Sequence, residues 1–173
     1  MMGLLHSLIG ISLLLTLPSV SDANLRYLRT VAFSVARMSP VQVTSEQIIG
    51  DYDTVTRPDN NHFDPALGVF TSPLKGVYAI DFSFHQDRVF TKSTTTKTFI
   101  KLTMETASDG KRTFLAPEGR PATVTSPISV QGASVLLELD KGDKIYLEAS
   151  QPVGANTQQP IAFSGYLITR TLD

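Results

Sequence analysis

Residues 76–85 read GVYAIDFSFH, and large apolar side chains alternate there with small or polar ones. Tyr78, Ile80, Phe82 and Phe84 fall on one side of an extended chain, because successive side chains of a β-strand point to opposite faces. The stretch is therefore predicted to be a half-buried strand with an aromatic inner face.

Three other stretches show the same alternation, at residues 99–104, 134–139 and 145–148. The last two are separated by the polar turn Asp140–Asp143, in which Gly142 can adopt a positive φ. The closing stretch, residues 162–169, differs because both of its faces carry apolar bulk. We expect the domain core on one side of it and a neighbouring subunit or a covering strand on the other.

The rest of the chain predicts only short strands, and no stretch after the first 23 residues keeps apolar residues at helical spacing for three turns. Many short strands between turn signals predict an all-β sandwich or jelly roll. Residues 116–132, rich in Pro, Gly, Ser and Thr, are predicted to be a long surface excursion. The additional short strands are expected near residues 31–36, 54–55, 68–71, 89–90 and 113–116.

The composition of the chain limits the functional classes to which the protein can belong. The chain has 173 residues, 42% of them hydrophobic and 18% charged, which suits one folded domain. Fifteen basic and sixteen acidic residues give a net charge of -1, so nucleic acid and anionic membrane are poor partners. The absence of cysteine excludes a disulfide scaffold, a thiolate metal site and a cysteine nucleophile.

The N-terminus resembles a secretory signal. Leu8–Leu17 is an apolar run that is too short to span a bilayer, and a breaker and small residues follow it. We predict a signal peptide over residues 1–23, a short linker over 24–29 and one domain over 30–173, in a secreted, extracellular protein. A buried N-terminal helix is the alternative.

Six motifs follow one another along the chain: VAFSV (31–35), FDPALGVFTSP (63–73), the alternating stretch 76–85, SVLLEL (134–139), Gly142-Asp143 and FSGYLI (163–168). This set, in this order, resembles the globular head domain of complement C1q, in the C1q/TNF-like superfamily. The resemblance runs from about residue 30 to residue 169. Two departures stand out: Tyr52 occupies a position where the family usually has Phe before an Asp, and residues 86–132 match loosely.

The resemblance implies a ten-stranded jelly-roll β-sandwich that assembles as a homotrimer. The chain has no collagen-like Gly-x-y run, so a stand-alone head domain without a collagen stem is expected. Its structural core is expected at Phe33, Phe70, Tyr78, Phe82, Phe84, Leu137, Leu139, Phe163, Gly165 and Leu167.

The sequence offers no catalytic constellation. His62 and His85 lack partners at a recognisable spacing, and Asp51 and Asp53 suit a solvated loop better than a catalytic pair. We therefore predict a protein that is not an enzyme and has no organic cofactor. The resemblance implies a calcium site near the trimer apex, for which Glu138 is the matching position. A solvated glutamate on an outer face is the alternative interpretation of Glu138.

The predicted function is that of a secreted, non-enzymatic recognition module. The resemblance implies a homotrimeric, lectin-like pattern-recognition protein of innate immunity that binds extracellular glycans, microbial surfaces or a protein ligand. A cytokine-like or adhesive ligand for a host receptor, or an extracellular matrix component, is the alternative. Candidate ligand-facing loops are residues 87–98, 109–112 and 151–160.

Overall fold

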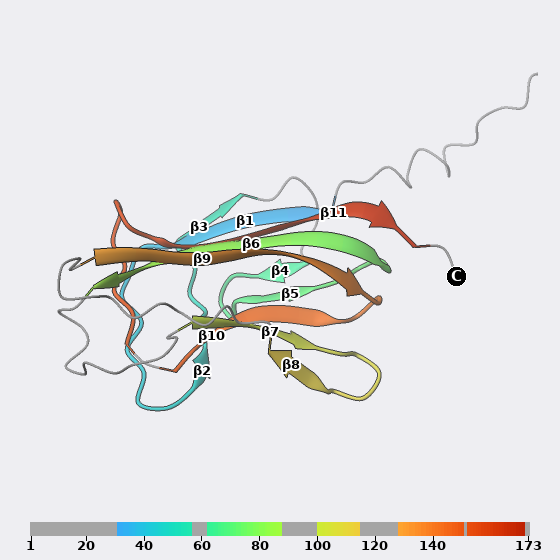
Figure 1. Cartoon of the computed structure of the whole chain (residues 1–173), viewed down its shortest axis with the longest axis horizontal. Helices are drawn as coiled ribbons and strands as arrows, with labels where there is room; N and C mark the ends of the chain where they lie inside the picture. Colours follow the sequence, from blue (N-terminus) through green and yellow to red (C-terminus); the bar gives the residue numbers. More distant parts are fainter. Residues whose placement is uncertain (1–30, 57–61, 88–99, 115–127, 151, 172–173) are drawn as a thin grey trace, which may run out of the picture.

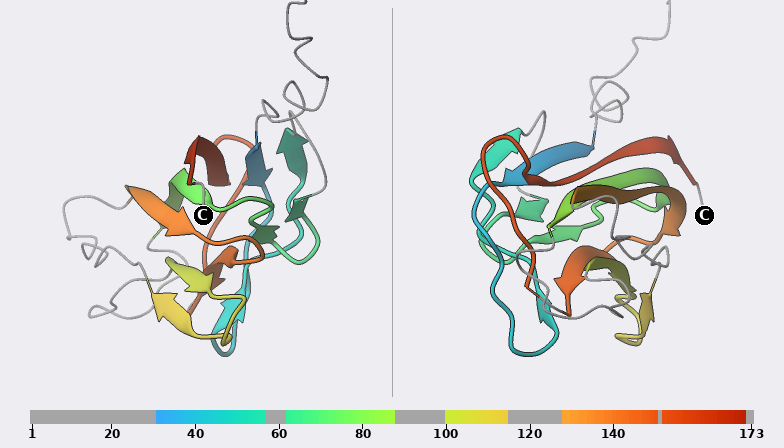
Figure 2. Two further views of the ribbon diagram at one scale, coloured as in Figure 1. Left: turned by 90° about the vertical axis from the view of Figure 1, so that its right-hand side faces the viewer. Right: turned by 60° about the vertical axis from the view of Figure 1, so that its left-hand side comes forward.

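The computed structural model describes residues 31–56, 62–87, 100–114, 128–150 and 152–171, and within these ranges it contains strands in two antiparallel sheets and no helix. The alternating stretch around Tyr78 is strand β6, whose tyrosine, isoleucine and phenylalanines are buried. The two sheets form the layers of a sandwich (Figures 1 and 2). The first sheet has the order β3 (Thr54–Thr56), β1 (Ala32–Arg37), β11 (Ile161–Arg170), β6 (Gly76–Asp87) and β9 (Ile128–Leu139).

The second sheet supplies the other layer. Its order is β4 (Phe63–Asp64), β5 (Val69–Thr71), β10 (Lys144–Ala149), β7 (Ile100–Glu105) and β8 (Arg112–Phe114), and β2 (Gln47–Ile48) also pairs with β10. Strands β5 and β6 follow each other in the chain but belong to different sheets. An all-β jelly-roll sandwich is the predicted fold class, and the structure confirms it.

An aromatic cluster fills the space between the layers. The Phe33 ring centroid lies 4.9 Å from that of Phe63, 4.8 Å from that of Phe70 and 5.0 Å from that of Phe163. Each large core side chain that is fully buried contributes roughly 1.5–3 kcal/mol. Of the expected core residues, Leu137 and Leu167 are only partly buried but pack against this cluster, and the eight others are buried.

Gly165 lies in the middle of β11, where glycine usually weakens a strand. A Cβ atom there would lie 2.6 Å from Ile80 Cδ1 and 2.7 Å from Phe33 Cε1. The glycine therefore allows the central phenylalanine of the cluster to approach the β11 backbone.

The structure corrects two expectations. Residues 128–132 are not part of a surface excursion but the first half of β9, because β6 extends to Asp87 and supplies pairing partners from Ser83 onward. The described residues contain eleven strands rather than ten, and two of these strands have only two residues.

Some expectations lie outside the described residues. These are the signal peptide and linker, the strand near 89–90 and most of the loop 87–98. The expected short strand near residues 113–116 is β8, which begins one residue earlier.

Candidate functional site

The outward side of the first sheet, here called the first-sheet face, begins with a row in which two large residues alternate with two alanines. In register across β1, β11, β6 and β9 lie Ala32, Tyr166, Ala79 and Leu136. Tyr166 is 50% exposed and Leu136 is 67% exposed. The alanines leave the tyrosine and leucine side chains standing above the sheet.

The next two rows of the first-sheet face are made of small residues. Ser164, Asp81 and Ser134 form one row and Ala162, Ser83 and Gly132 the next. They line a shallow groove of about 370 Å³ beside the large residues. The face thus has a ridge and a groove, which is a shape that another protein surface can fill.

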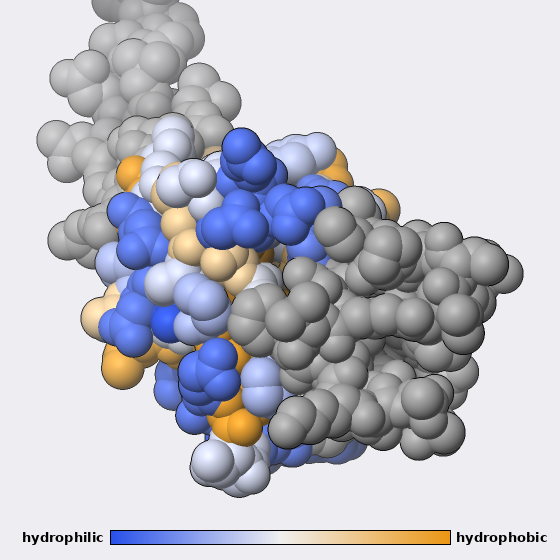
Figure 3. Space-filling model, turned by 90° about the vertical axis from the view of Figure 1, so that its left-hand side faces the viewer, coloured by the Kyte–Doolittle hydropathy of each residue, from blue (hydrophilic) through white to orange (hydrophobic). Residues whose placement is uncertain are grey.

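The large exposed hydrophobic side chains of the described residues gather in two places. Leu136, Tyr166 and Ile168 lie on or beside the first-sheet face, whereas Ile48 and Leu67 lie near the second sheet. Elsewhere the surface is mixed: the end of the sandwich in Figure 3 shows hydrophobic residues as small separate areas between hydrophilic ones. Apolar groups gathered on a surface commonly mark interaction sites, whereas scattered ones do not.

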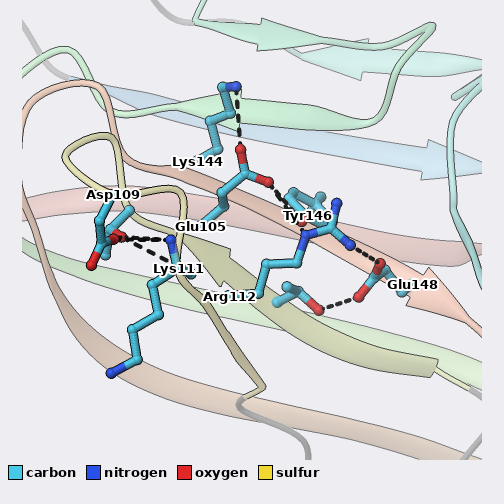
Figure 4. A network of polar contacts seen from close by, with 9 residues as sticks. Glu105, Asp109, Lys111, Arg112, Lys144, Tyr146 and Glu148 are labelled. Atoms are coloured by element: carbon cyan, nitrogen blue, oxygen red, sulfur yellow. Dashed lines mark hydrogen bonds and ion pairs between the residues drawn. The ribbon is translucent and has the colours of Figure 1, made fainter.

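The outward side of the second sheet carries a network of charges (Figure 4). Glu105 receives a hydrogen bond from the Tyr146 hydroxyl at 3.2 Å and lies 3.5 Å from both Lys144 Nζ and Arg112 Nε. Arg112 also lies 3.6 Å from Glu148, although Glu148 is buried. Opposite charges therefore alternate along the network and balance one another.

Tyr146 and Glu148 are buried on a face where strand alternation predicts exposure. The Arg112 guanidinium covers the Tyr146 ring at 5.9 Å from its centroid, and the Thr103 hydroxyl donates to Glu148 at 2.6 Å. Burial, the largest effect, raises the pKa of Tyr146 from its ordinary 10.0 to about 12. Tyr146 and Glu148 are thus packed parts of the sheet, whereas the Arg112 and Lys144 side chains that cover them reach solvent.

A pocket of about 280 Å³ opens beside this network and is here called the second-sheet pocket. Tyr146, Glu105 and Lys144 line it from the network side. The other lining residues come from β2, from β5 and from the segment around β4; they are Ile48, Val69, Leu67, His62, Asp64 and Thr71.

The candidate site residues chosen from the sequence lie apart from one another in the structure. Glu138 is exposed on β9, and no three His, Asp or Glu side chains of the described residues form a metal cluster. Within the described residues Glu138 is therefore not brought together with other candidate ligands, and its role in calcium binding stays a prediction. His85 is half-buried, its Nδ1 has no described hydrogen-bond partner, and it does not line the second-sheet pocket that His62 lines.

The two acids near Tyr52 have structural contacts rather than catalytic ones. Asp51 pairs with Arg37 at 3.6 Å, and Asp53 accepts a hydrogen bond from the Met38 N–H at 2.6 Å. These contacts hold the segment after β1 against the segment before β3.

Two predicted ligand loops are partly or fully described, and both are held by their own side chains. In the β7–β8 turn, Asp109 accepts from the Thr106 hydroxyl and from the Lys111 N–H. These two hydrogen bonds hold the pKa of Asp109 below its usual range, and the bond from the Thr106 hydroxyl has the larger effect. In the described part of 151–160, the Asn156 side chain accepts from the N–H groups of residues 158 and 159.

The second-sheet pocket is the site that sequence reasoning missed. Its polar residues come from β5, β7, β10 and the segment before β5, which become neighbours only through strand pairing. The sequence predicts that Tyr146 and Glu148 share a face, but nothing in it pairs that face with Arg112. The burial of Tyr146 and Glu148 could therefore not be predicted from the alternation.

Comparisons with known proteins agree with the resemblance seen in the sequence. A family model described as the C1q domain matches residues 32–168. Protein HP-25 homolog 1 of Bos taurus is 30% identical over 118 residues, which cover 68% of this chain and 48% of that protein. The chain thus spans about half the length of this curated relative.

Solved structures share the fold. The globular domain of zebrafish complement 1qA protein matches with a TM-score of 0.62 and 24% identity, over 82% of this chain and 99% of that one. Murine APRIL at pH 8.5 matches with a TM-score of 0.58 and 8% identity, over 81% of this chain and 100% of that one. At these identities the structures show a common jelly-roll fold only. Because the family model covers most of the sequence, the chain belongs to the C1q domain family.

Proposed function

We propose that this protein is a secreted, non-enzymatic recognition module that works as a homotrimer, and that it is a lectin-like pattern-recognition protein of innate immunity. Domains of the C1q/TNF-like type form trimers and bind extracellular ligands, and C1q-domain proteins are typically secreted. No helix in the described residues is long and apolar enough to cross a membrane.

The observation that carries the proposal is the first-sheet face. Leu136, Tyr166 and Ile168 are half-exposed or more, on a sheet whose other side forms the core. Leaving such a surface in water costs free energy that a partner surface recovers, at about 25 cal/mol per Å². A second copy of the same chain is always present at the same concentration as the first. We therefore assign the first-sheet face to contacts between subunits.

A trimer would convert weak contacts into useful binding. Three identical ligand sites that face the same patterned surface raise the overall affinity by about 10²–10⁴ when the geometry allows simultaneous engagement. Glycans repeated on a microbial surface present such a pattern. Calcium belongs to this proposal only as an ion shared between subunits, with Glu138 as one ligand from each copy.

The test is sedimentation velocity of the chain without residues 1–23, with calcium and with a chelator, followed by binding to glycan, microbial and extracellular-protein arrays. The proposal expects a trimer, and binding to repeated glycans that a monomeric variant loses. A stable monomer, or a trimer that binds none of the arrays, contradicts it. A trimer that selects one membrane receptor favours the cytokine-like alternative, and dissociation of the trimer by the chelator alone supports the shared calcium site.

A further inference from the structure

The second-sheet pocket contains polar groups that the fold does not use. Within the described residues, no hydrogen bond or ion pair engages the imidazole of His62 or the hydroxyl of Thr71. Among the same residues, the Asp64 carboxylate is engaged only through Oδ1, which accepts from the N–H groups of Ala66 and Leu67 at 2.9 and 3.0 Å. Donors and acceptors therefore converge on one opening without partners of their own.

These groups are fixed by the backbone. The Thr71 N–H donates to the His62 carbonyl at 2.8 Å, which sets the two side chains next to each other. Thr71 pairs with Lys144 and Lys144 pairs with Glu105, so these three lie in one row across three strands. A site built on paired strands loses little conformational entropy when a ligand binds.

The apolar part of the pocket comes from a hydrogen-bonded turn and from β2. Leu67 is 64% exposed at the tip of the β4–β5 turn. Asp64 Oδ1 accepts hydrogen bonds within this turn, and the backbone carbonyl of Asp64 also accepts one from the Gly68 N–H at 2.7 Å. Ile48, 36% exposed, lies on β2 and lines the same opening. A ligand therefore meets aliphatic side chains beside the polar groups.

Size and charge restrict the ligand. The pocket measures about 280 Å³, near the lower end of the roughly 300–1,000 Å³ that small-molecule sites occupy. Lys144 is balanced by Glu105 at 3.5 Å, and Asp64 adds one negative charge. An anionic ligand is disfavoured in such a site. A small uncharged ligand with several hydroxyl groups and an apolar side suits it.

We propose that the second-sheet pocket binds one uncharged sugar ring. Thr71 and His62 hydrogen-bond ring hydroxyls, Asp64 Oδ2 accepts from another, and Leu67 and Ile48 contact the C–H side of the ring. Stacking on an aromatic ring is not part of the site, because Tyr146 is only 1% exposed. The inference rests on the proposed glycan recognition and adds to it the residues that perform it.

The pocket is also placed for use in a trimer. It lies on the outward side of the second sheet, whereas the proposed subunit contacts use the outward side of the first sheet. The first-sheet face therefore does not itself cover the pocket, and the pocket stays open in a trimer whose complementary patch lies away from the outward side of the second sheet.

The test is a methyl-detected NMR titration of the trimer with the methyl glycosides of glucose, mannose and galactose, and with N-acetylneuraminic acid as the anionic probe. We expect shifts of the Leu67 and Ile48 methyl groups with an uncharged sugar and weaker binding of the anionic one. Thr71→Val and His62→Gln should each weaken binding by roughly two- to tenfold, the range of one hydrogen bond. Thr56→Val, an exposed threonine on β3 of the other sheet, is the matched control and should bind as the wild type does.

The outcomes separate this inference from the proposed function. If the wild-type trimer binds an uncharged sugar but Thr71→Val and His62→Gln bind it equally well, the pocket assignment is wrong and lectin-like recognition stands. Tighter binding of the anionic sugar also overturns the assignment. If no sugar shifts the spectrum while the arrays reveal a protein ligand, the sugar site fails and a recognition module of another kind remains.

Discussion

At the scale of single residues, Tyr52 shows how a core can carry a polar group without using it. Its ring meets Phe63 edge-on at 5.5 Å between centroids, and the side chain is buried. Its hydroxyl has no hydrogen-bond partner among the described residues. Burial, opposed in part by the charge of Arg37, raises the pKa of this hydroxyl strongly.

Tyr52→Phe removes the unpaired hydroxyl and keeps the ring. We expect a free energy of unfolding between the wild-type value and about 2 kcal/mol above it, because an unsatisfied buried hydroxyl costs about 1–3 kcal/mol. Equilibrium unfolding in urea measures the difference. Tyr52→Ala, which also removes the ring, should cost about 3–5 kcal/mol. A loss of more than about 1 kcal/mol for the Phe variant would mean that the hydroxyl has a partner.

Phe82 tests the assignment of faces on β6. It is buried, and it pairs in register with the buried Phe163 of β11. We expect Phe82→Ala to lower the free energy of unfolding by about 3–5 kcal/mol, the usual cost of truncating a large core side chain. Ser83→Ala, a change on the outward side of the same strand, is the control and should be nearly neutral. A loss of less than about 1 kcal/mol for Phe82→Ala would contradict the face assignment.

Tyr146 links stability to alkaline pH. Its pKa is about 12 in the folded chain, mainly through burial, against an ordinary 10.0. The folded state therefore favours the neutral phenol; this contribution to stability is complete below pH 10 and is lost as the pH rises toward 12. Unfolding curves should show that the free energy of unfolding falls less between pH 9 and pH 11.5 for Tyr146→Phe than for the wild type. Equal losses would mean that Tyr146 ionises freely in the folded protein.

At the scale of elements, the turn between β9 and β10 shows why Gly142-Asp143 is needed there. Gly142 has a φ of 95°, and Asp143 is buried. The Asp143 carboxylate accepts from the Ala107 N–H and the Asp140 N–H, both at 2.8 Å. One side chain therefore fastens its own turn to the turn that follows β7.

Asp143→Ala should destabilise the fold by about 2–4 kcal/mol, because it leaves two N–H groups without their charged acceptor. Asp143→Asn keeps one acceptor oxygen and should cost less. The control is Asp140→Ala, which removes an exposed carboxylate 3.5 Å from Lys75 Nζ and should cost under about 1 kcal/mol. Thermal and urea unfolding measure all three, and equal values for the two alanine variants would contradict the bridging role of Asp143.

The elements also show how far the sequence could predict the structure. Alternation placed β6, because burial on one side of a strand leaves a period of two in the residues themselves, whereas β11 was predicted from apolar side chains on both of its faces. Composition was misleading for residues 128–132, which were assigned to a surface excursion, because they pair with the extension of β6 to Asp87. The second-sheet pocket could not be predicted from the sequence, because Thr71, Lys144 and Glu105 become neighbours only when their strands pair in register.

At the scale of the whole molecule, the distribution of exposed apolar side chains defines where subunits should meet. Leu136 and Leu67 are almost equally exposed, at 67% and 64%, but they lie on opposite layers of the sandwich. If exposure alone drove association, both would contribute to assembly. The proposed trimer places Leu136, and not Leu67, in the contact between subunits.

Leu136→Glu should therefore shift the sedimentation coefficient from trimer to monomer, because a buried unpaired charge in the interface is costly. Leu67→Glu places the same charge at a matched exposed leucine and should leave the trimer intact. The reverse pattern, with Leu67→Glu monomeric, would move the interface to the second sheet. Circular dichroism of both variants checks that the sandwich still forms.

The pairing of β1 with β11 joins the beginning of the described chain to its end, with Ala32 opposite Tyr166. During synthesis β1 can pair early with β3, but its other edge stays open until residues 161–170 have been made. Pairings so distant along the chain form slowly, and an open strand edge can pair wrongly in the interval. Until then the nascent polypeptide presents its aromatic interior to its surroundings, and in the proposed secreted protein chaperones of the secretory route would have to shield it until β11 has been made.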